Sequence, residues 1–222
     1  MRKIAVIPAR KGSVGIPNKN LQKISELSLL DRTIKFVKEL LLFDEIIVTT
    51  DYSEKEYDSK DVINRKRPIE LATSSATMVD VLLDVIAEYK IKDDDQIVLF
   101  QPTSPFRIKR DVTRVLELLR EHDSVITVKE LDINLSLIVQ PCNSTALKQK
   151  DVRAEETNRQ HQGLQYYPNG NLFGVRVGSF LKTQSFYGEK LGYILQEGKL
   201  NVDVNCMLDL EFAIQLENMD KL

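Results

Sequence analysis

Residues 4–20 of the chain read Ile-Ala-Val-Ile-Pro-Ala-Arg-Lys-Gly-Ser-Val-Gly-Ile-Pro-Asn-Lys-Asn. The apolar run 4–7 lies between charged residues and Pro8, which predicts a short buried strand. Residues 10–20 are polar and contain two glycines and three cationic side chains, which predicts a loop. Ligands of open α/β sheets bind beyond the carboxyl ends of the strands, so we expect this loop to lie at a ligand site.

A strand followed by a helix recurs along the chain. Apolar residues at helical spacing predict helices at 30–41, 79–86, 112–119 and 208–218. Compact apolar runs predict further strands at 45–50, 96–100, 124–128, 172–177, 193–195 and 201–205. Alternating strands and helices predict an α/β fold: a three-layer, doubly wound, mostly parallel sheet with helices on both faces.

Between residues 129 and 167 this alternation fails. Residues 135–139 have the composition of a strand, but residues 143–165 are polar and lack apolar periodicity. A loop of this length inside a compact domain is usually functional, or it is an arm that packs on another subunit. We therefore interpret residues 1–222 as one domain with a small inserted arm at 129–167.

Composition excludes several classes of protein. The formal net charge of −2 gives no overall field that would attract nucleic acid or an anionic membrane. Two cysteines, Cys142 and Cys206, are too few for a disulfide framework or a thiolate zinc site. No stretch approaches the ~18 apolar residues of a membrane span, and the first apolar run is too short for a signal peptide. We expect a cytoplasmic protein that binds neither nucleic acid nor a membrane.

The loop after the first strand has the composition of an anion site. Gly12 and Gly15 let backbone N–H groups approach an anion, and Arg10, Lys11 and Lys19 add positive charge. The loop is neither a Walker loop nor a dinucleotide fingerprint, because the glycine and lysine spacings differ. A polyphosphate cradle is therefore predicted. The alternative is an ordinary glycine turn with solvated lysines.

Residues 7–20 resemble the N-terminal signature of the acylneuraminate cytidylyltransferases, the CMP-sialic acid synthetase family. Further segments agree in order and spacing, the last two in part: 48–51, 67–72, 101–107, 167–170 and 202–205. The resemblance covers nearly the whole chain and implies a nucleotide-diphospho-sugar transferase-like fold. It also implies that the inserted arm at 129–167 serves dimerisation and reaches the sugar site of the neighbouring subunit. It also implies transfer of CMP from CTP to a sialic-acid-type nonulosonic acid, with release of pyrophosphate, Mg²⁺ as cofactor, and a homodimer.

The resemblance further implies roles for individual residues. Contacts to the nucleotide are implied for Arg10, Gly12, Ser13, Lys19, Asn20, Arg67 and Ser74. Contacts to the sugar are implied for Gln101, Thr103, Ser104, Tyr167 and Asn169. Asp203 and Asn205 occupy the metal positions, and Arg10, Lys19 and Asp203 are the candidate catalytic residues.

Alternatives stay open at several of these positions. Arg67 is implied to read the cytosine edge, but it also fits a solvated basic run at 65–67. Residues 101–105 are expected to hold their polar side chains outward for sugar hydroxyls, yet they also fit an ordinary strand-to-helix turn. Arg107 is a candidate partner for a carboxylate or a surface residue.

Four positions depart from the family pattern. Asn205 replaces the second metal carboxylate, Val14 a common lysine, Tyr167 a common arginine, and residues 134–137 a His-Pro-x-Lys stretch. Two departures concern CTP and the metal, and two concern the sugar pocket. The alternatives are a different acidic acceptor, another nucleotidyltransferase specificity, or a relative that binds nucleotide without turnover.

Overall fold

A computed structural model describes residues 1–13, 15–131, 139–142, 146–149 and 164–219. These residues form two compact units, one of 1–128 with 168–222 and one of 129–167, and each is considered by itself. The departures at Val14 and 134–137 lie outside the described residues, as does most of the predicted strand at 135–139. That the second unit is a dimerisation arm stays a prediction.

The elements follow each other in an α/β order. The strands are β1 (Lys3–Ala9), β2 (Lys23–Ile24), β3 (Leu27–Ser28), β4 (Glu45–Thr50), β5 (Ile63–Lys66), β6 (Gln96–Phe100), β7 (Ser124–Glu130), β8 (Val139–Pro141), β9 (Leu147–Gln149), β10 (Tyr166–Arg176) and β11 (Leu191–Leu195). The α-helices are α1 (Leu29–Leu40), α2 (Met78–Glu88), α3 (Lys109–Leu118), α4 (Val177–Thr183) and α5 (Met207–Met219). Short 3₁₀ helices are η1 (Lys19–Leu21), η2 (Ile69–Leu71) and η5 (Gly198–Asn201).

The main sheet has seven strands in the order β11-β7-β10-β6-β1-β4-β5. β1 pairs in parallel with β4 and β6, β4 with β5, and β7 with β11, whereas β10 runs antiparallel to β6. This arrangement confirms the predicted α/β class and the mostly parallel sheet.

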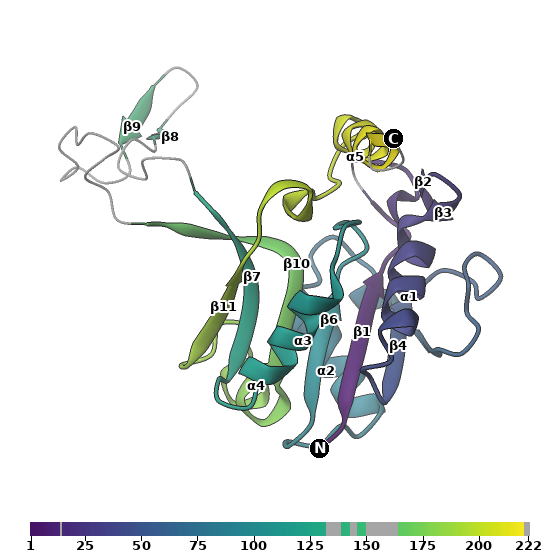
Figure 1. Cartoon of the computed structure of the whole chain (residues 1–222), viewed down its shortest axis with the longest axis vertical. Coiled ribbons are helices and arrows are strands. Elements are labelled where there is room, and N and C mark those ends of the chain that lie inside the picture. Colours follow the sequence, from purple (N-terminus) through teal and green to yellow (C-terminus); the bar gives the residue numbers. More distant parts are fainter. Residues whose placement is uncertain (14, 132–138, 143–145, 150–163, 220–222) are drawn as a thin grey trace. The chain divides into compact units, whose positions relative to one another are not determined.

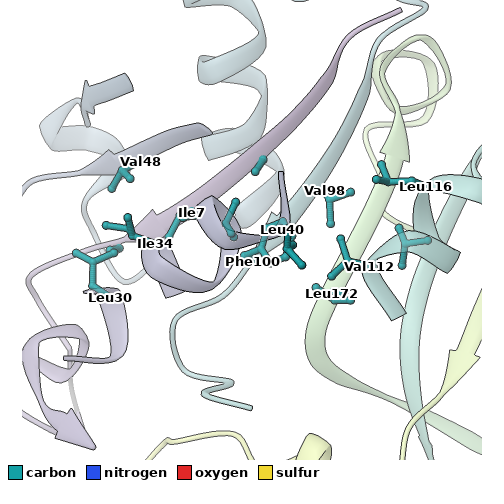
Figure 2. Close-up of a cluster of buried hydrophobic side chains, with 14 of the residues drawn as sticks. Ile7, Leu30, Ile34, Leu40, Val48, Val98, Phe100, Val112, Leu116 and Leu172 are labelled. Carbon is teal, nitrogen blue, oxygen red and sulfur yellow. The ribbon is translucent and has the colours of Figure 1, made fainter. Parts of the chain in front are cut away.

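Helices cover both faces of this sheet (Figure 1). On one face, α1 and α3 pack on the strands, and Figure 2 shows their buried side chains among those of β1, β4, β6 and β10. The labelled members of this cluster are Ile7, Leu30, Ile34, Leu40, Val48, Val98, Phe100, Val112, Leu116 and Leu172. On the other face, Leu82 and Val85 of α2 and Phe180 of α4 join a second cluster with Ile4 and Ile97. The three-layer prediction is thereby confirmed.

The order of the strands makes the carboxyl end of β1 a topological switch point. From β1 the chain moves through α1 to β4 and β5, and then returns through α2 to β6 on the other side of β1. Right-handed crossovers in opposite directions put the two helices on opposite faces. The loops that follow β1 and β6 therefore leave the sheet side by side, where ligands bind in such folds.

Some sequence predictions differ from the structure. The strand expected at 201–205 is wrong, because η5 ends at Asn201 and Val204 donates its backbone N–H to the carbonyl of Thr103 in a loop, at 2.8 Å. β10 begins at Tyr166, before the expected 172, and β5, α4 and the β2–β3 hairpin were not predicted. None of the helices in the described residues has the length and apolar character that crossing a membrane requires.

Candidate active site

Three segments from distant parts of the chain line one cavity of about 350 Å³. They are the phosphate loop (residues 10–20), the substrate loop (101–107) and the carboxylate loop (202–205). The lining residues are Pro8, Arg10, Ser13, Gly15, Lys19, Asn20, Arg67, Met78, Gln101, Pro102, Thr103 and Asn205. The structure thus brings together most of the residues predicted for the nucleotide and two of those predicted for the sugar.

The phosphate loop is held by its own polar contacts. Asn20 is buried, and its Nδ2 donates to the carbonyl of Arg10 at 2.9 Å. The N–H of Lys11 donates to Asp51 Oδ1 at 2.7 Å, and Lys11 Nζ pairs with Glu56 at 3.1 Å. Lys11 therefore contacts the segment after β4 and is not among the described residues that line the cavity.

Gly15 fixes the distance between the phosphate loop and the carboxylate loop. A Cβ atom at this position would lie 2.4 Å from the carbonyl oxygen of Asn205. Ordinary C···O contacts are about 3.3 Å or longer, so only glycine allows this approach. At Gly12 the same atom would meet Arg10 Nη1 at 3.8 Å, an ordinary contact.

Lys19 lies in a partly buried position with charges of both signs around it. Burial lowers the pKa of Lys19, and Arg10 lowers it further, whereas Asp203 and Asp209 raise it. Two of the three candidate catalytic residues, Arg10 and Asp203, therefore lie close enough to the third, Lys19, to shift its pKa. The interpretation of Lys19 as a fully solvated lysine is not supported.

Arg67 directly follows β5 and points inward, and its backbone N–H donates to the carbonyl of Thr50 at the end of β4 at 2.8 Å. Only 4% of the residue is exposed, and its Nη2 donates to the carbonyl of Thr49 at 2.8 Å. Burial is the largest cause that lowers the pKa of Arg67 to about 10, and Asp51 opposes it. Arg67 Nε is buried and has no hydrogen-bond partner in the described part of the chain. The alternative of a solvated basic run is therefore wrong for Arg67.

The polar side chains of the substrate loop do not all face the cavity. Gln101 and Thr103 line the cavity as expected for sugar contacts, whereas Ser104 is fully buried. Its backbone N–H closes a turn to the carbonyl of Gln101 at 3.1 Å, and its Oγ is buried among the described residues without a partner. The prediction that Ser104 points outward is wrong, because the turn directs its side chain into the protein.

Asn169 belongs to an internal hydrogen-bond network. Its Oδ1 accepts from Thr127 Oγ1 at 2.7 Å, and its Nδ2 donates to Gln196 and Asn201, each at 2.8 Å. Both amide hydrogens are used, which argues against the implied sugar contact.

Two other predicted contact residues are not among the described residues that line the cavity. Tyr167 is exposed and belongs to the second unit, where Lys129 Nζ lies 5.9 Å from its ring centroid. Its contact with a sugar stays a prediction. Ser74 is exposed and is not among the described residues that line the cavity.

The carboxylate loop offers an oxygen suited to a hard cation. Asp203 Oδ2 accepts from Asn205 Nδ2 at 2.8 Å, while Asp203 Oδ1 is buried without a partner among the described residues. The described part of the chain holds no group of three or more His, Cys, Asp or Glu arranged for a metal. Mg²⁺ takes few protein carboxylates when phosphates and water complete its octahedron. The unpaired oxygen of Asp203 therefore fits a magnesium ion carried mainly by a triphosphate.

Arg107 acts inside the protein and not as a partner for an external carboxylate. It donates to the carbonyl of Gln101 and, at 3.3 Å, to Thr33 Oγ1. Burial lowers the pKa of Arg107 to about 9, Arg32 lowers it further, and Asp203 raises it.

Met78, at the start of α2, also lines the cavity and was missed, because a methionine at helical spacing carries no signal that separates a core position from a site position.

A cavity at the switch point of a doubly wound sheet, lined by a basic glycine loop and by Asn205, which hydrogen-bonds to the carboxylate of Asp203, is typical of nucleotide-binding α/β proteins. The chain belongs to the cytidylyltransferase family, whose model, described as "Cytidylyltransferase", matches residues 4–222.

Two curated relatives show this similarity in sequence. The chain is 30% identical to N-acylneuraminate cytidylyltransferase of Escherichia coli over 96% of its own length and 52% of that protein. It is 24% identical to CMP-N,N'-diacetyllegionaminic acid synthase of Legionella pneumophila, over 100% of its own length and 98% of that protein. The chain thus spans about half the length of the first relative.

Solved structures show the same fold. CMP:2-keto-3-deoxy-manno-octonic acid synthetase complexed with CTP aligns with a TM-score of 0.71 at 15% identity, covering 99% of this chain and 100% of that one. The 2-C-methyl-D-erythritol 4-phosphate cytidylyltransferase of Francisella tularensis aligns with a TM-score of 0.69 at 15% identity, covering 96% and 98%. These similarities confirm the nucleotidyltransferase-like fold.

Proposed function

We propose that this chain transfers CMP from CTP to a sialic-acid-type nonulosonic acid and releases pyrophosphate. The observation that carries this proposal is that the phosphate loop, Arg67, the substrate loop and the carboxylate loop line the same cavity. The family membership supports the nucleotide, and the names of the Escherichia coli and Legionella relatives support an acidic nine-carbon acceptor.

The proposed reaction needs no covalent bond to the protein. The oxygen of the sugar's anomeric hydroxyl forms a bond to the α-phosphorus, and the bond from that phosphorus to the α,β-bridging oxygen breaks. Pyrophosphate leaves with the bridging oxygen, and the hydroxyl proton passes to water. Arg10 and Lys19 stabilise the negative charge that builds on the phosphates during this displacement.

The other residues bind and orient the two substrates. Gly12, Ser13 and Asn20 of the phosphate loop are proposed to hold the nucleotide with Arg67, whose anchored guanidinium would donate to cytosine. Gln101 and Thr103 would contact the sugar. When Mg²⁺ is bound, it supplies charge neutralisation of the triphosphate, and Asp203 and Asn205 are the residues proposed to hold it.

A different acidic acceptor is the second candidate function. One relative of which this chain covers 98% of the length is named CMP-N,N'-diacetyllegionaminic acid synthase. Tyr167 and Asn205 also depart from the family pattern at the sugar and metal positions. A relative that binds CTP without turnover is the third possibility. In each case we propose a cytoplasmic homodimer that does not act on nucleic acid.

An acceptor screen tests these alternatives. The protein is incubated with CTP, Mg²⁺ and one of three acids, N-acetylneuraminate, diacetyllegionaminate or 2-keto-3-deoxy-manno-octonate, and pyrophosphate release is measured. We expect release with one of the nine-carbon acids and none without an acceptor.

The isosteric variant Asp203→Asn serves as the matched test of the carboxylate. Its kcat should fall by about 10²-fold or more, the size of loss when one group that stabilises a transition-state charge is removed. CTP binding without release from any acid would contradict the transferase proposal and support the binding-only relative. Full activity of Asp203→Asn would contradict the metal role.

A further inference from the structure

Asn171 is a buried polar residue of β10 with no assigned role. It is 0% exposed and is followed in the strand by Leu172 and Phe173. Burying a carboxamide costs free energy unless its polar atoms find partners. Its Nδ2 has two partners, the carbonyl of Phe106 at 2.9 Å and the carbonyl of Leu200 at 3.0 Å.

These two carbonyls belong to the two segments that meet at the cavity. Phe106 lies in the substrate loop, whose Gln101 and Thr103 line the cavity. Leu200 lies in η5, which leads directly into the carboxylate loop. A single side chain therefore binds the substrate loop with one hydrogen and the base of the carboxylate loop with the other.

The same two loops also touch once through their backbones. The N–H of Val204 donates to the carbonyl of Thr103 at 2.8 Å. Val204 follows Asp203, and Thr103 lies on the cavity wall, so this bond joins the loops next to the site. Asn171 connects the same two loops at a second point, through the carbonyls of Phe106 and Leu200. Two connections at different points hinder rotation of one loop relative to the other.

Only the amide nitrogen of the Asn171 side chain makes hydrogen bonds to the two loops. Its Oδ1 is buried and has no hydrogen-bond partner among the described residues, which costs stability. A leucine of similar shape would avoid this cost. What asparagine supplies and leucine lacks is the pair of N–H donors.

We propose that Asn171 is a positioning residue that fixes the separation between the substrate loop and the carboxylate loop, and thereby between the acceptor sugar and Asp203. This inference rests on the proposed function. Asn171 is not among the described residues that line the cavity, so it acts through the carbonyls of Phe106 and Leu200 and not by touching a substrate.

The kinetic test compares Asn171→Leu with a matched control, Thr127→Val. Thr127 is also fully buried, and it hydrogen-bonds to Asn169 and the backbone of Leu172 but to neither loop. In Asn171→Leu, kcat should fall by about 10- to 100-fold, as expected when reacting groups are displaced by up to ~1 Å. The KM for CTP should change by less than about threefold, because the phosphate loop and Arg67 are untouched. Thr127→Val should keep the wild-type kcat.

The positioning role would be overturned if Thr127→Val lowered kcat as much as Asn171→Leu does. It would also be overturned if Asn171→Leu raised the KM for CTP and left kcat unchanged. A purely structural effect of the substitution would lower the melting temperature of both variants without separating their kcat values.

Hydrogen exchange gives a readout that does not depend on activity. In Asn171→Leu, the non-proline amides of residues 101–107 and the amides of 200–205 should exchange at least about tenfold faster, while those of β1 and β4 keep their wild-type rates. Thr127→Val should show no such selective change. If the wild-type protein transfers CMP to no acid, selective loosening still supports the coupling of the two loops and only the proposed function fails. Unchanged exchange in both loops overturns the inference, whatever the activity.

The unmodified protein provides a further check in case Asn171→Leu does not fold. Both Nδ2 protons of Asn171, followed by nuclear magnetic resonance with ¹⁵N-labelled asparagine, should exchange slowly with solvent because both are buried and bonded. Fast exchange of either proton would contradict the bridge.

Discussion

At the scale of single residues, Arg67 shows how burial converts a flexible cation into a fixed donor. Its Nη2 is anchored on the carbonyl of Thr49, and the residue is 4% exposed. A guanidinium held in this way presents its remaining donors in one direction, which suits two acceptors in one plane, such as O2 and N3 of cytosine. Lysine would place one flexible ammonium group there and lose the planar match.

The neighbouring arginine makes a matched comparison possible. Arg65 pairs with Asp84 at 2.8 Å and is not among the described residues that line the cavity. In Arg67→Lys, the KM for CTP should rise by about tenfold or more and the preference for CTP over UTP should shrink, because a site built around hydrogen bonds discriminates through them. Arg65→Lys should keep both values within about twofold of wild type, since Arg65 bonds to Asp84 and is not among the described residues that line the cavity. Steady-state kinetics with CTP and UTP checks this, and equal effects of the two substitutions would refute base reading by Arg67.

At the scale of elements, the site depends on how closely three loops approach one another. The phosphate loop and the carboxylate loop meet at Gly15, where a Cβ would lie 2.4 Å from the carbonyl oxygen of Asn205. The contact joins backbone to backbone, so neither partner has a flexible end that can move aside. The position of Asp203 relative to Lys19 is therefore set partly by the absence of a side chain at residue 15.

Gly15→Ala tests this close approach. The added methyl group should push the loops apart and lower kcat/KM by about 10- to 100-fold, since displacements near 1 Å have effects of this size. Gly12→Ala keeps the backbone N–H through which Gly12 would hold the nucleotide, and its new Cβ would lie 3.8 Å from Arg10 Nη1, an ordinary contact, so the loss should not exceed about threefold. The two variants are compared by pyrophosphate release and by melting temperature. Equal losses would mean that glycine acts in this loop through backbone flexibility and not through the contact with Asn205.

The sequence predicts those features that depend on residues close together along the chain. β4 and β6 were predicted with the residue limits found, because their apolar runs are continuous and end at polar residues. The phosphate loop was predicted because its glycines and cations are local in sequence. By contrast, the direction of Ser104, the network of Asn169 and the bridge of Asn171 depend on segments far away along the chain. The false strand at 201–205 has the same origin, since its backbone pairs with a loop and not with the sheet.

At the scale of the whole molecule, residues 129–167 form a second compact unit. Its two ends lie together, because the N–H of Leu131 donates to the carbonyl of Gln165 at 2.8 Å. A hydrogen-bonded pair of this kind can be joined by a two-residue Asn-Gly turn. Residues 132–164 can therefore be replaced by such a turn without stretching the flanking strands, and the main unit keeps its own hydrophobic clusters.

This shortened chain tests the proposed homodimer. The full chain of 25.4 kDa should show twice that mass by light scattering at micromolar concentration, whereas the shortened chain should be monomeric. Its affinity for CTP should stay within about threefold of wild type, because the cavity is lined by the main unit, yet CMP transfer should be lost if a neighbour's arm completes the sugar site. The matched control is Thr127→Val, which alters a buried contact of the main unit and should remain dimeric. A monomeric full chain, or a shortened chain that keeps the wild-type kcat, would contradict the arm's proposed role, because an acceptor site that works in one subunit needs nothing from a second.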